Sequence, residues 1–117
     1  PMTNSQMTWK AMNSAAILNI KTLASKYGCK VMVCEVGVKA SASEIATSTQ
    51  CLTDFMNSVK SLSVCAGVFY WEPQVDGKWR PAIYEKQGRN WGAYDMGAFT
   101  SDGSAITPTS ILSAFGE

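Results

Sequence analysis

Two short apolar runs alternate with two helical patterns in this chain, and this alternation restricts the folds open to it more than any other feature. The runs cover residues 30–37 and 64–72 and are rich in valine and aromatic residues. Each follows a segment, 9–27 and 45–62, in which apolar residues recur every three or four positions, as in a helix packed along one side. Helix, strand, helix, strand with short connections predicts an α/β fold with the two strands as parallel neighbours. Because both faces of each run are apolar, we expect both faces of the strands to be covered.

The first two helices have recognisable ends and apolar stripes. Thr8 is a favourable N-cap, and Gly28 suits the left-handed position after the first helix. Glu44, just inside the second helix, complements the helix dipole. The residues expected on the apolar stripes are Trp9, Met12, Ala16, Ile20, Leu23 and Tyr27 in the first helix, and Ile45, Leu52, Phe55, Met56, Val59 and Leu62 in the second.

The remainder of the chain differs in texture. Residues 73–97 form a long loop with interleaved aromatic and charged residues, and a loop of this length is uncommon unless it is functional. Asp102 and Gly103 indicate a turn. A last short helix is expected, with Thr107 as its cap and Pro108 at its first position.

The composition excludes several classes of function. The chain has 117 residues, a net charge of +1 and no histidine, so a Ser-His-Asp triad, a Cys-His pair and a His-ligated zinc site are ruled out. The balanced charge lacks the basic stripe that nucleic-acid binding requires. No apolar run approaches the ~18 residues of a membrane span. The four cysteines, at positions 29, 34, 51 and 65, fit no zinc motif; we expect buried thiols, with a Cys29–Cys65 disulfide as the alternative.

Two glutamates lie at or near the ends of the apolar runs, at the places where α/β folds bind ligands. Glu35 is near the carboxyl end of the first strand, and Glu72 ends the second, directly after Trp71. Two carboxylates and an indole on one rim would equip a sugar site. The alternatives are an ion pair of Glu35 with Lys30, Lys39 or an arginine, a structural hydrogen-bonding role for Glu72, and a core role for Trp71.

Four aromatic residues lie in the loop that follows: Trp79, Tyr84, Trp91 and Tyr94. They suit sugar subsites, and they equally suit a small core belonging to the loop itself. The sequence leaves both interpretations open.

Several motifs together resemble the C-terminal part of glycoside hydrolase family 53, the arabinogalactan endo-β-1,4-galactanases. The motifs lie at residues 31–37 (VMVCEVG), 67–73 (GVFYWEP), 90–99 and 111–115. The resemblance covers essentially the whole chain. It implies a (β/α)₈ TIM barrel, of which residues 1–117 would be one partial catalytic domain, from about helix 6 to helix 8. Pro1 would then mark a cut inside that domain, and the chain would be incomplete as a barrel on its own.

The same resemblance implies retaining hydrolysis of β-1,4-galactan or arabinogalactan by two glutamates. Glu35 matches the nucleophile, Trp71 the aromatic residue beneath the scissile sugar, and Trp91 a loop residue lining the cleft. The acid/base glutamate would lie upstream of Pro1. Glu72 and Trp79 are further candidates for substrate binding from their positions. No cofactor and no metal ligand is assigned, although some bacterial members hold calcium in their late loops; the implied location is extracellular, at the bacterial cell surface or in the periplasm.

If the chain holds only one of the two catalytic glutamates, three hypotheses about its function remain. A retaining glycosidase needs two carboxyl groups about 5–5.5 Å apart, and a complete barrel typically takes ~250 residues. The first hypothesis is that the chain supplies the nucleophile half of a galactanase. The second is a catalytically silent carbohydrate-binding fragment that uses Trp71, Trp79 and Trp91. The third is an inert half-barrel; in any of these states, uncovered strand edges favour self-association.

Overall fold

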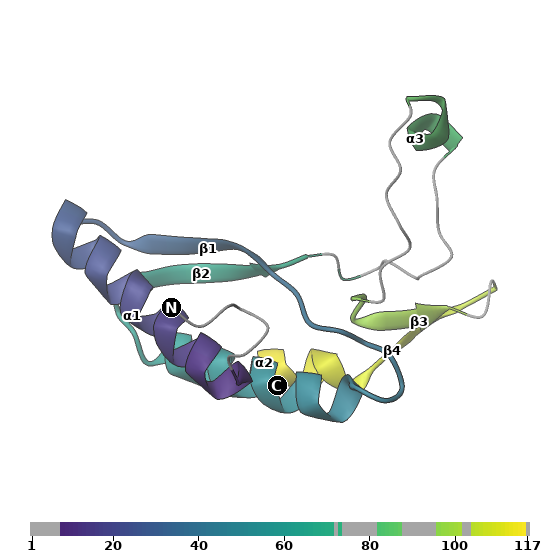
Figure 1. Ribbon diagram of the computed structural model, residues 1–117, viewed down its shortest axis with the longest axis horizontal. Coiled ribbons are helices and arrows are strands. Elements are labelled where there is room, and N and C mark those ends of the chain that lie inside the picture. The colour runs from purple at the N-terminus through teal and green to yellow at the C-terminus, as the bar shows by residue number, and fades with distance from the viewer. Residues whose placement is uncertain (1–7, 72, 74–81, 88–95, 102–103, 117) are drawn as a thin grey trace.

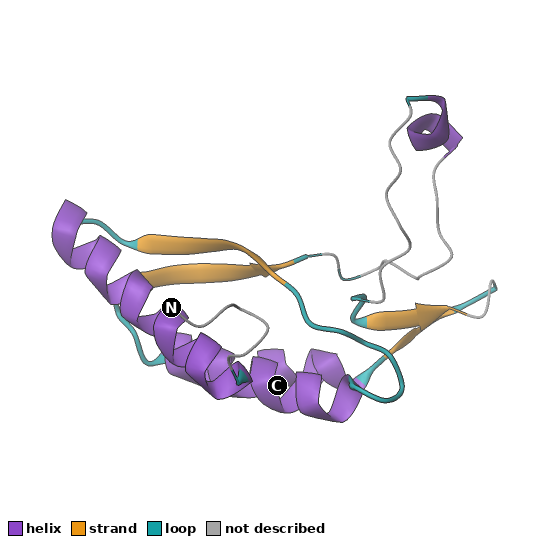
Figure 2. Ribbon diagram, in the orientation of Figure 1, coloured by secondary structure: helices purple, strands orange, loops and turns teal. Residues whose placement is uncertain are grey.

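The computed structural model describes residues 8–71, 73, 82–87, 96–101 and 104–116. Figure 2 shows the mixture of helices and strands in this part of the chain. In chain order the elements are α1 (Trp9–Tyr27), β1 (Val31–Val36), α2 (Ile45–Lys60), β2 (Cys65–Tyr70), α3 (Ala82–Lys86), β3 (Phe99–Ser101), β4 (Ile106–Pro108) and the 3₁₀ helix η2 (Ser110–Phe115).

The strands β1 and β2 pair in parallel, which confirms the expected arrangement of the two apolar runs. Both α1 and α2 lie on the same side of this two-stranded sheet (Figure 1). The expectation that both faces of the strands are covered is wrong for the described residues: Met32 is 42% exposed and Phe69 62%. Because both long helices pack on one side, the apolar residues that face the other way have no described element above them. We call this side the open face.

The ends of α1 are those that the sequence predicts. The N–H of Ala11 donates to Oγ1 of Thr8 at 3.3 Å, and Gly28 takes the left-handed conformation with φ of 61°. The predicted apolar stripe is only partly correct. Ile20 is buried, but Met12, Leu23 and Tyr27 are exposed, and Ala24 is buried instead. The buried side of the helix is therefore rotated relative to that stripe, because Asn13 and Ile17, which lie outside the stripe, contact the rest of the chain together with Ala16 and Ile20.

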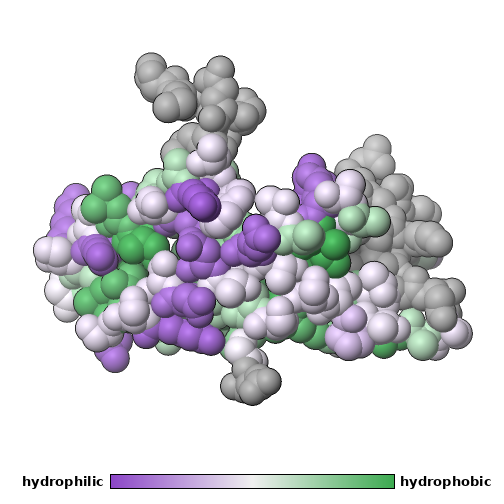
Figure 3. All heavy atoms as spheres, turned by 90° about the horizontal axis from the view of Figure 1, so that it is seen from below, coloured by the Kyte–Doolittle hydropathy of each residue, from purple (hydrophilic) through white to green (hydrophobic). Residues whose placement is uncertain are grey.

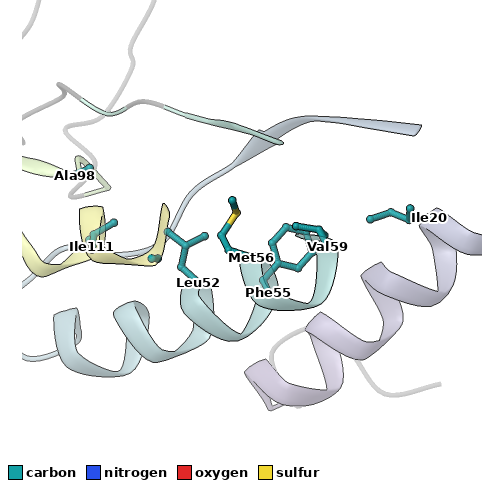
Figure 4. Packing of buried hydrophobic residues seen from close by; sticks show 8 residues of the cluster. Ile20, Leu52, Phe55, Met56, Val59, Ala98 and Ile111 are labelled. Atoms are coloured by element: carbon teal, nitrogen blue, oxygen red, sulfur yellow. The ribbon is translucent and has the colours of Figure 1, made fainter. Parts of the chain in front are cut away.

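The core lies between α2, the sheet and η2. Figure 4 shows its side chains pointing from α2 towards the sheet and η2. Leu52 and Ile111 are fully buried, and the other buried members of the cluster are Ile20, Phe55, Met56, Val59, Ala98 and Ala114. These members include most of the apolar stripe predicted for the second helix. Polar contacts run along the same seam: the hydroxyls of Thr49 and Ser110 are 2.9 Å apart, and Lys60 Nζ donates to the Phe115 carbonyl at 3.1 Å.

The last part of the chain differs from the prediction. Thr107 and Pro108 belong to β4, which pairs antiparallel with β3 in a hairpin that the sequence did not indicate. The turn expected at residues 102–103 lies outside the described residues, between these two strands. The last helix is a 3₁₀ helix capped by Thr109, whose Oγ1 accepts from Ile111 N–H at 3.3 Å. Pro108 is tolerated in β4 because it ends a short edge strand, where the missing N–H is not needed for the ladder.

The remaining surface features concern the helices and the cysteines. Apolar side chains gather at the end of the molecule where α1 stops and β1 begins, at the left of Figure 3, and Leu18 and Leu23 of α1 are exposed. In the part of the chain that the structure describes, no helix is long and apolar enough to cross a membrane.

All four cysteines are described and all are free thiols. Cys29 and Cys34 are exposed, so the expectation of buried thiols is wrong for these two, and a Cys29–Cys65 disulfide is not formed.

Candidate active site

The candidate site lies at the carboxyl ends of β1 and β2. Val36 pairs with Tyr70, and the N–H of Trp71 donates to the Val36 carbonyl at 2.8 Å. This bond extends the parallel ladder by one residue beyond β2. It places Glu35 and Trp71 on adjacent paired segments at the same edge of the sheet.

An irregularity in β1 directs Glu35 to the open face. Val33 pairs with Val68 and Val36 with Tyr70, so three steps along β1 oppose two along β2. Val33 and Val36 are both partly buried against the core, whereas Glu35 and its neighbour Cys34 are exposed. Strict alternation would have placed Glu35 on the same side as Val33, towards the helices. The bulge therefore turns the carboxylate towards the open face, a common role for such irregularities near functional sites.

Among the described residues, the Glu35 side chain has neither a hydrogen bond nor an ion pair. Lys39, one of its expected partners, instead contacts Glu44, with Nζ 3.4 Å from Oε1. A hydrogen bond from Ser41 is the main cause that lowers the pKa of the Glu44 carboxyl, with Lys39 contributing. Lys30 also makes no ion pair within this part of the chain. The interpretation of Glu35 as the partner of Lys30 or Lys39 is therefore not supported. The arginines, its other expected partners, are at positions 80 and 89, outside the described residues.

The backbone around Trp71 is closely packed. A Cβ atom on Gly37 would lie 2.5 Å from the Trp71 carbonyl oxygen and 2.6 Å from Cε of Met96. Only glycine lets the chain leave β1 so close to these atoms. The Trp71 side chain remains 45% exposed. The Trp71 indole is thus available to a ligand at this edge, while the Trp71 backbone is held in place by its neighbours.

The chain that leaves β2 returns to the same edge before β3. The N–H of Ala98 donates to the Pro73 carbonyl at 2.8 Å, and the Tyr70 hydroxyl donates to the Met96 carbonyl at 2.7 Å. The intervening segment begins and ends beside Trp71, and α3 is its described helix, away from the sheet in Figure 1. Tyr70 is a residue that sequence reasoning missed, although its place directly before Trp71 could have drawn attention to it.

Several predicted site residues cannot be placed. Glu72, Trp79 and Trp91 lie outside the described residues. So does Tyr94, while Tyr84 belongs to α3 without a described side chain. The site is therefore built from Glu35 and Trp71.

Among the described residues, this edge of the sheet carries one carboxylate, Glu35, and one indole, Trp71. Asp54, another described acidic residue, lies on the helical side, where Oδ2 accepts from Asn13 Nδ2 at 2.9 Å. No group of acidic, cysteine or histidine side chains suited to a metal ion occurs within the described ranges. An exposed carboxylate beside an aromatic face can attack or stabilise a sugar's anomeric centre, but retaining hydrolysis also requires a second carboxyl group as proton donor.

Comparison with known proteins agrees with this chemistry. The model of glycosyl hydrolase family 53 matches residues 6–112. Neither the curated proteins nor the solved structures contain a match to the chain. Family 53 is a TIM-barrel family of glycosidases that generally need no cofactor. The described residues form a mixed α/β arrangement without a closed barrel. Since the family match spans nearly the whole sequence, the chain belongs to glycosyl hydrolase family 53.

Proposed function

We propose that this chain supplies the nucleophile half of the active site of a retaining endo-β-1,4-galactanase, with Glu35 as the nucleophile. The observation that carries the proposal is the exposed Glu35 carboxylate at the carboxyl edge of a parallel sheet, which has no hydrogen bond or ion pair among the described residues, in a chain of a glycosidase family. In TIM-barrel enzymes the catalytic residues come from this end of the strands.

The chemistry follows from the position of this carboxylate. An oxygen of Glu35 attacks the anomeric carbon of a galactose unit, and the bond from that carbon to the bridging oxygen breaks. A second carboxylic acid, which we place outside these 117 residues, protonates the leaving oxygen. The same group then removes a proton from water, which attacks the anomeric carbon and releases Glu35.

Trp71 is the proposed stacking surface for the sugar. Its exposed indole can lie against the apolar face of a galactose ring, next to the carboxylate. We assign Glu72, Trp79 and Trp91 to further contacts along the polysaccharide. The same aromatic surface would serve a binding fragment without catalysis, so Glu35 is the residue that separates the two functions.

The proposed substrate is galactan or arabinogalactan. Because a polysaccharide does not cross a membrane unaided, we place the enzyme outside the cytoplasm, in the medium, at the cell surface or in the periplasm. We also propose that the 117-residue chain self-associates through the outer edges of β1 and β2, since exposed strand edges readily pair with further strands. Sedimentation at increasing protein concentration tests this association.

Fusion to the upstream barrel segment of a family 53 enzyme tests the catalytic proposal. The fusion is expected to release reducing ends from β-1,4-galactan. Glu35→Ala should lower that rate by at least about 1,000-fold, the scale found when a catalytic nucleophile is removed. Glu44→Ala, which removes another carboxylate of the same chain, is the matched control and should keep the rate. Substantial turnover by the Glu35→Ala fusion would contradict the nucleophile assignment.

A further inference from the structure

Tyr70 joins three segments that meet at the candidate site. It is the last residue of β2, and its hydroxyl donates to the Met96 carbonyl at 2.7 Å. The same oxygen accepts from the N–H of Val38, two residues after β1, at 3.4 Å. Its ring packs edge-to-face on Phe115 of η2, with centroids 5.8 Å apart and an angle of 84°. One side chain thus connects the exit of β1, the end of β2 and the segment that leads into β3.

These connections surround the place where the backbone is tightest. The carbonyl of Trp71 and the side chain of Met96 both crowd Gly37, on which a Cβ atom would clash with either. Gly37 is two residues after Glu35 and directly before Val38. A side chain that fixes the positions of Val38 and Met96 therefore also fixes the position of the end of β1 relative to Trp71.

We propose that Tyr70 is a positioning residue for the active site, whose hydroxyl fixes Glu35 and Trp71 relative to each other by tying Val38 to Met96. The inference rests on the proposed function of Glu35 and Trp71. A nucleophile must be held in a near-attack position, and a displacement of about 1 Å can lower the rate about 100-fold.

The hydroxyl is suited to this role because it keeps its proton. Burial raises the pKa of Tyr70 above its usual 10.0. At neutral pH the hydroxyl therefore donates its proton to the nearer of two main-chain carbonyls, that of Met96 at 2.7 Å rather than that of Val38 at 3.3 Å, while it accepts from the Val38 N–H. Phenylalanine would fill the same space against Phe115 but would leave both bonds unmade.

Amide hydrogen exchange of the Tyr70→Phe chain tests the tie directly. The Trp71 N–H, which is bonded to Val36 at the site, should exchange about tenfold faster, because loss of a hydrogen bond typically weakens local structure by that order. The Val31 N–H, bonded to the Val64 carbonyl at the opposite end of the sheet, should exchange at an unchanged rate. An unchanged Trp71 rate, or an equal rise at both ends, would overturn the inference.

Binding of β-1,4-galactotetraose, measured by calorimetry, tests the consequence for the site. Tyr70→Phe should weaken binding several-fold, whereas Asn13→Ala, which removes contacts between α1 and α2, should leave it unchanged. Unchanged binding by Tyr70→Phe, or equal weakening in both variants, would contradict a positioning role. If the unmodified chain fails to bind the oligosaccharide, the proposed function fails, and the exchange rates alone decide whether Tyr70 fixes this edge.

Discussion

The two faces of the β1–β2 sheet show what the same kind of residue does in two environments. On the helical side, Val33 and Val68 pack against a cluster centred on the fully buried Leu52. On the open face, Met32 and Phe69 are comparably apolar but exposed. The helical face stabilises the fold, and the open face carries the side chains available for chemistry. Apolar character in a strand therefore indicates burial only where another element lies above it.

Glu35 belongs to this comparison because its neighbours on both sides are apolar. The irregularity between Val33 and Val36 leaves both valines on the helical side of the sheet and Glu35 exposed on the other side. A regular strand would turn this carboxylate towards the core, where a charge without a partner is strongly unfavourable. The difference between the faces thus depends on one extra residue in β1.

Paired truncations on the two faces should give the largest difference. Leu52→Ala removes a fully buried side chain and should lower the free energy of unfolding by about 2–5 kcal/mol. Phe69→Ala on the open face should change it by no more than about 0.5 kcal/mol, as for exposed positions generally. Urea titration of both variants measures the contrast. Equal destabilisation would show that the open face is packed in solution.

Crowding at the exit of β1 predicts the next largest effect. Gly37→Ala places a methyl group against the Trp71 carbonyl and Met96, and should destabilise the chain by about 1–3 kcal/mol. Gly28→Ala is the control: its Cβ would meet no atom within 4 Å, and only the strain of a φ of 61° remains, about 1 kcal/mol. Galactan binding should fall in the first variant alone. Equal galactan binding by the two variants would show that the Gly37 contacts do not affect the candidate site.

The polar contact between the helices should give a smaller effect, confined to the helical side. Asn13 Nδ2 donates to the Cys51 carbonyl and to Asp54 Oδ2, each at 2.9 Å. Asn13→Ala should destabilise the chain by about 1–2 kcal/mol, since both bonds are lost. Asn19→Ala, at an exposed position of the same helix, is the matched variant and should have little effect in thermal unfolding. A similar loss in both would mean that helix propensity rather than the contact was measured.

Alkaline pH should have the smallest effect on stability, through Tyr70 at the carboxyl edge of the sheet. Burial raises the pKa of Tyr70, so its contribution to stability is fully present below the unfolded value of 10.0 and is lost as the pH rises through the folded value. Tyr70→Phe should therefore flatten the decline of the urea midpoint above about pH 10. Tyr27→Phe removes an exposed phenol for comparison. An identical decline in the parent chain and Tyr70→Phe would contradict the assignment.

Much of the fold could be predicted because its determinants are local. Thr8 and Gly28 fix the ends of α1 through their own chemistry, and the period of the apolar residues in α2 identifies its buried face. The hairpin of β3 and β4 could not be predicted in this way. Its strands have three residues each, too few to show alternation, and Thr107–Pro108 also fits the start of a helix.

The candidate site residues could be proposed from the sequence, but their geometry could not. Glu35 and Trp71 follow from the position of each at a strand end and from the resemblance to the family. The face on which Glu35 lies depends on a bulge that β1 shows only when paired with β2. The role of Tyr70 depends on Met96, 26 residues later in the chain, and no sequence period connects the two.

The most direct test of the central claim is covalent labelling of the 117-residue chain. A fluorinated β-1,4-galactobioside with a dinitrophenolate leaving group needs no proton donor, because the leaving group departs as a stable anion. The Glu35 carboxylate would displace it and form an ester with the anomeric carbon, which the fluorine protects from rapid hydrolysis. We predict one added galactobiosyl group, found by mass spectrometry on the peptide that contains Glu35, and none on Glu35→Ala. An unlabelled chain, or a label on another residue, would contradict the assignment of Glu35 as the nucleophile.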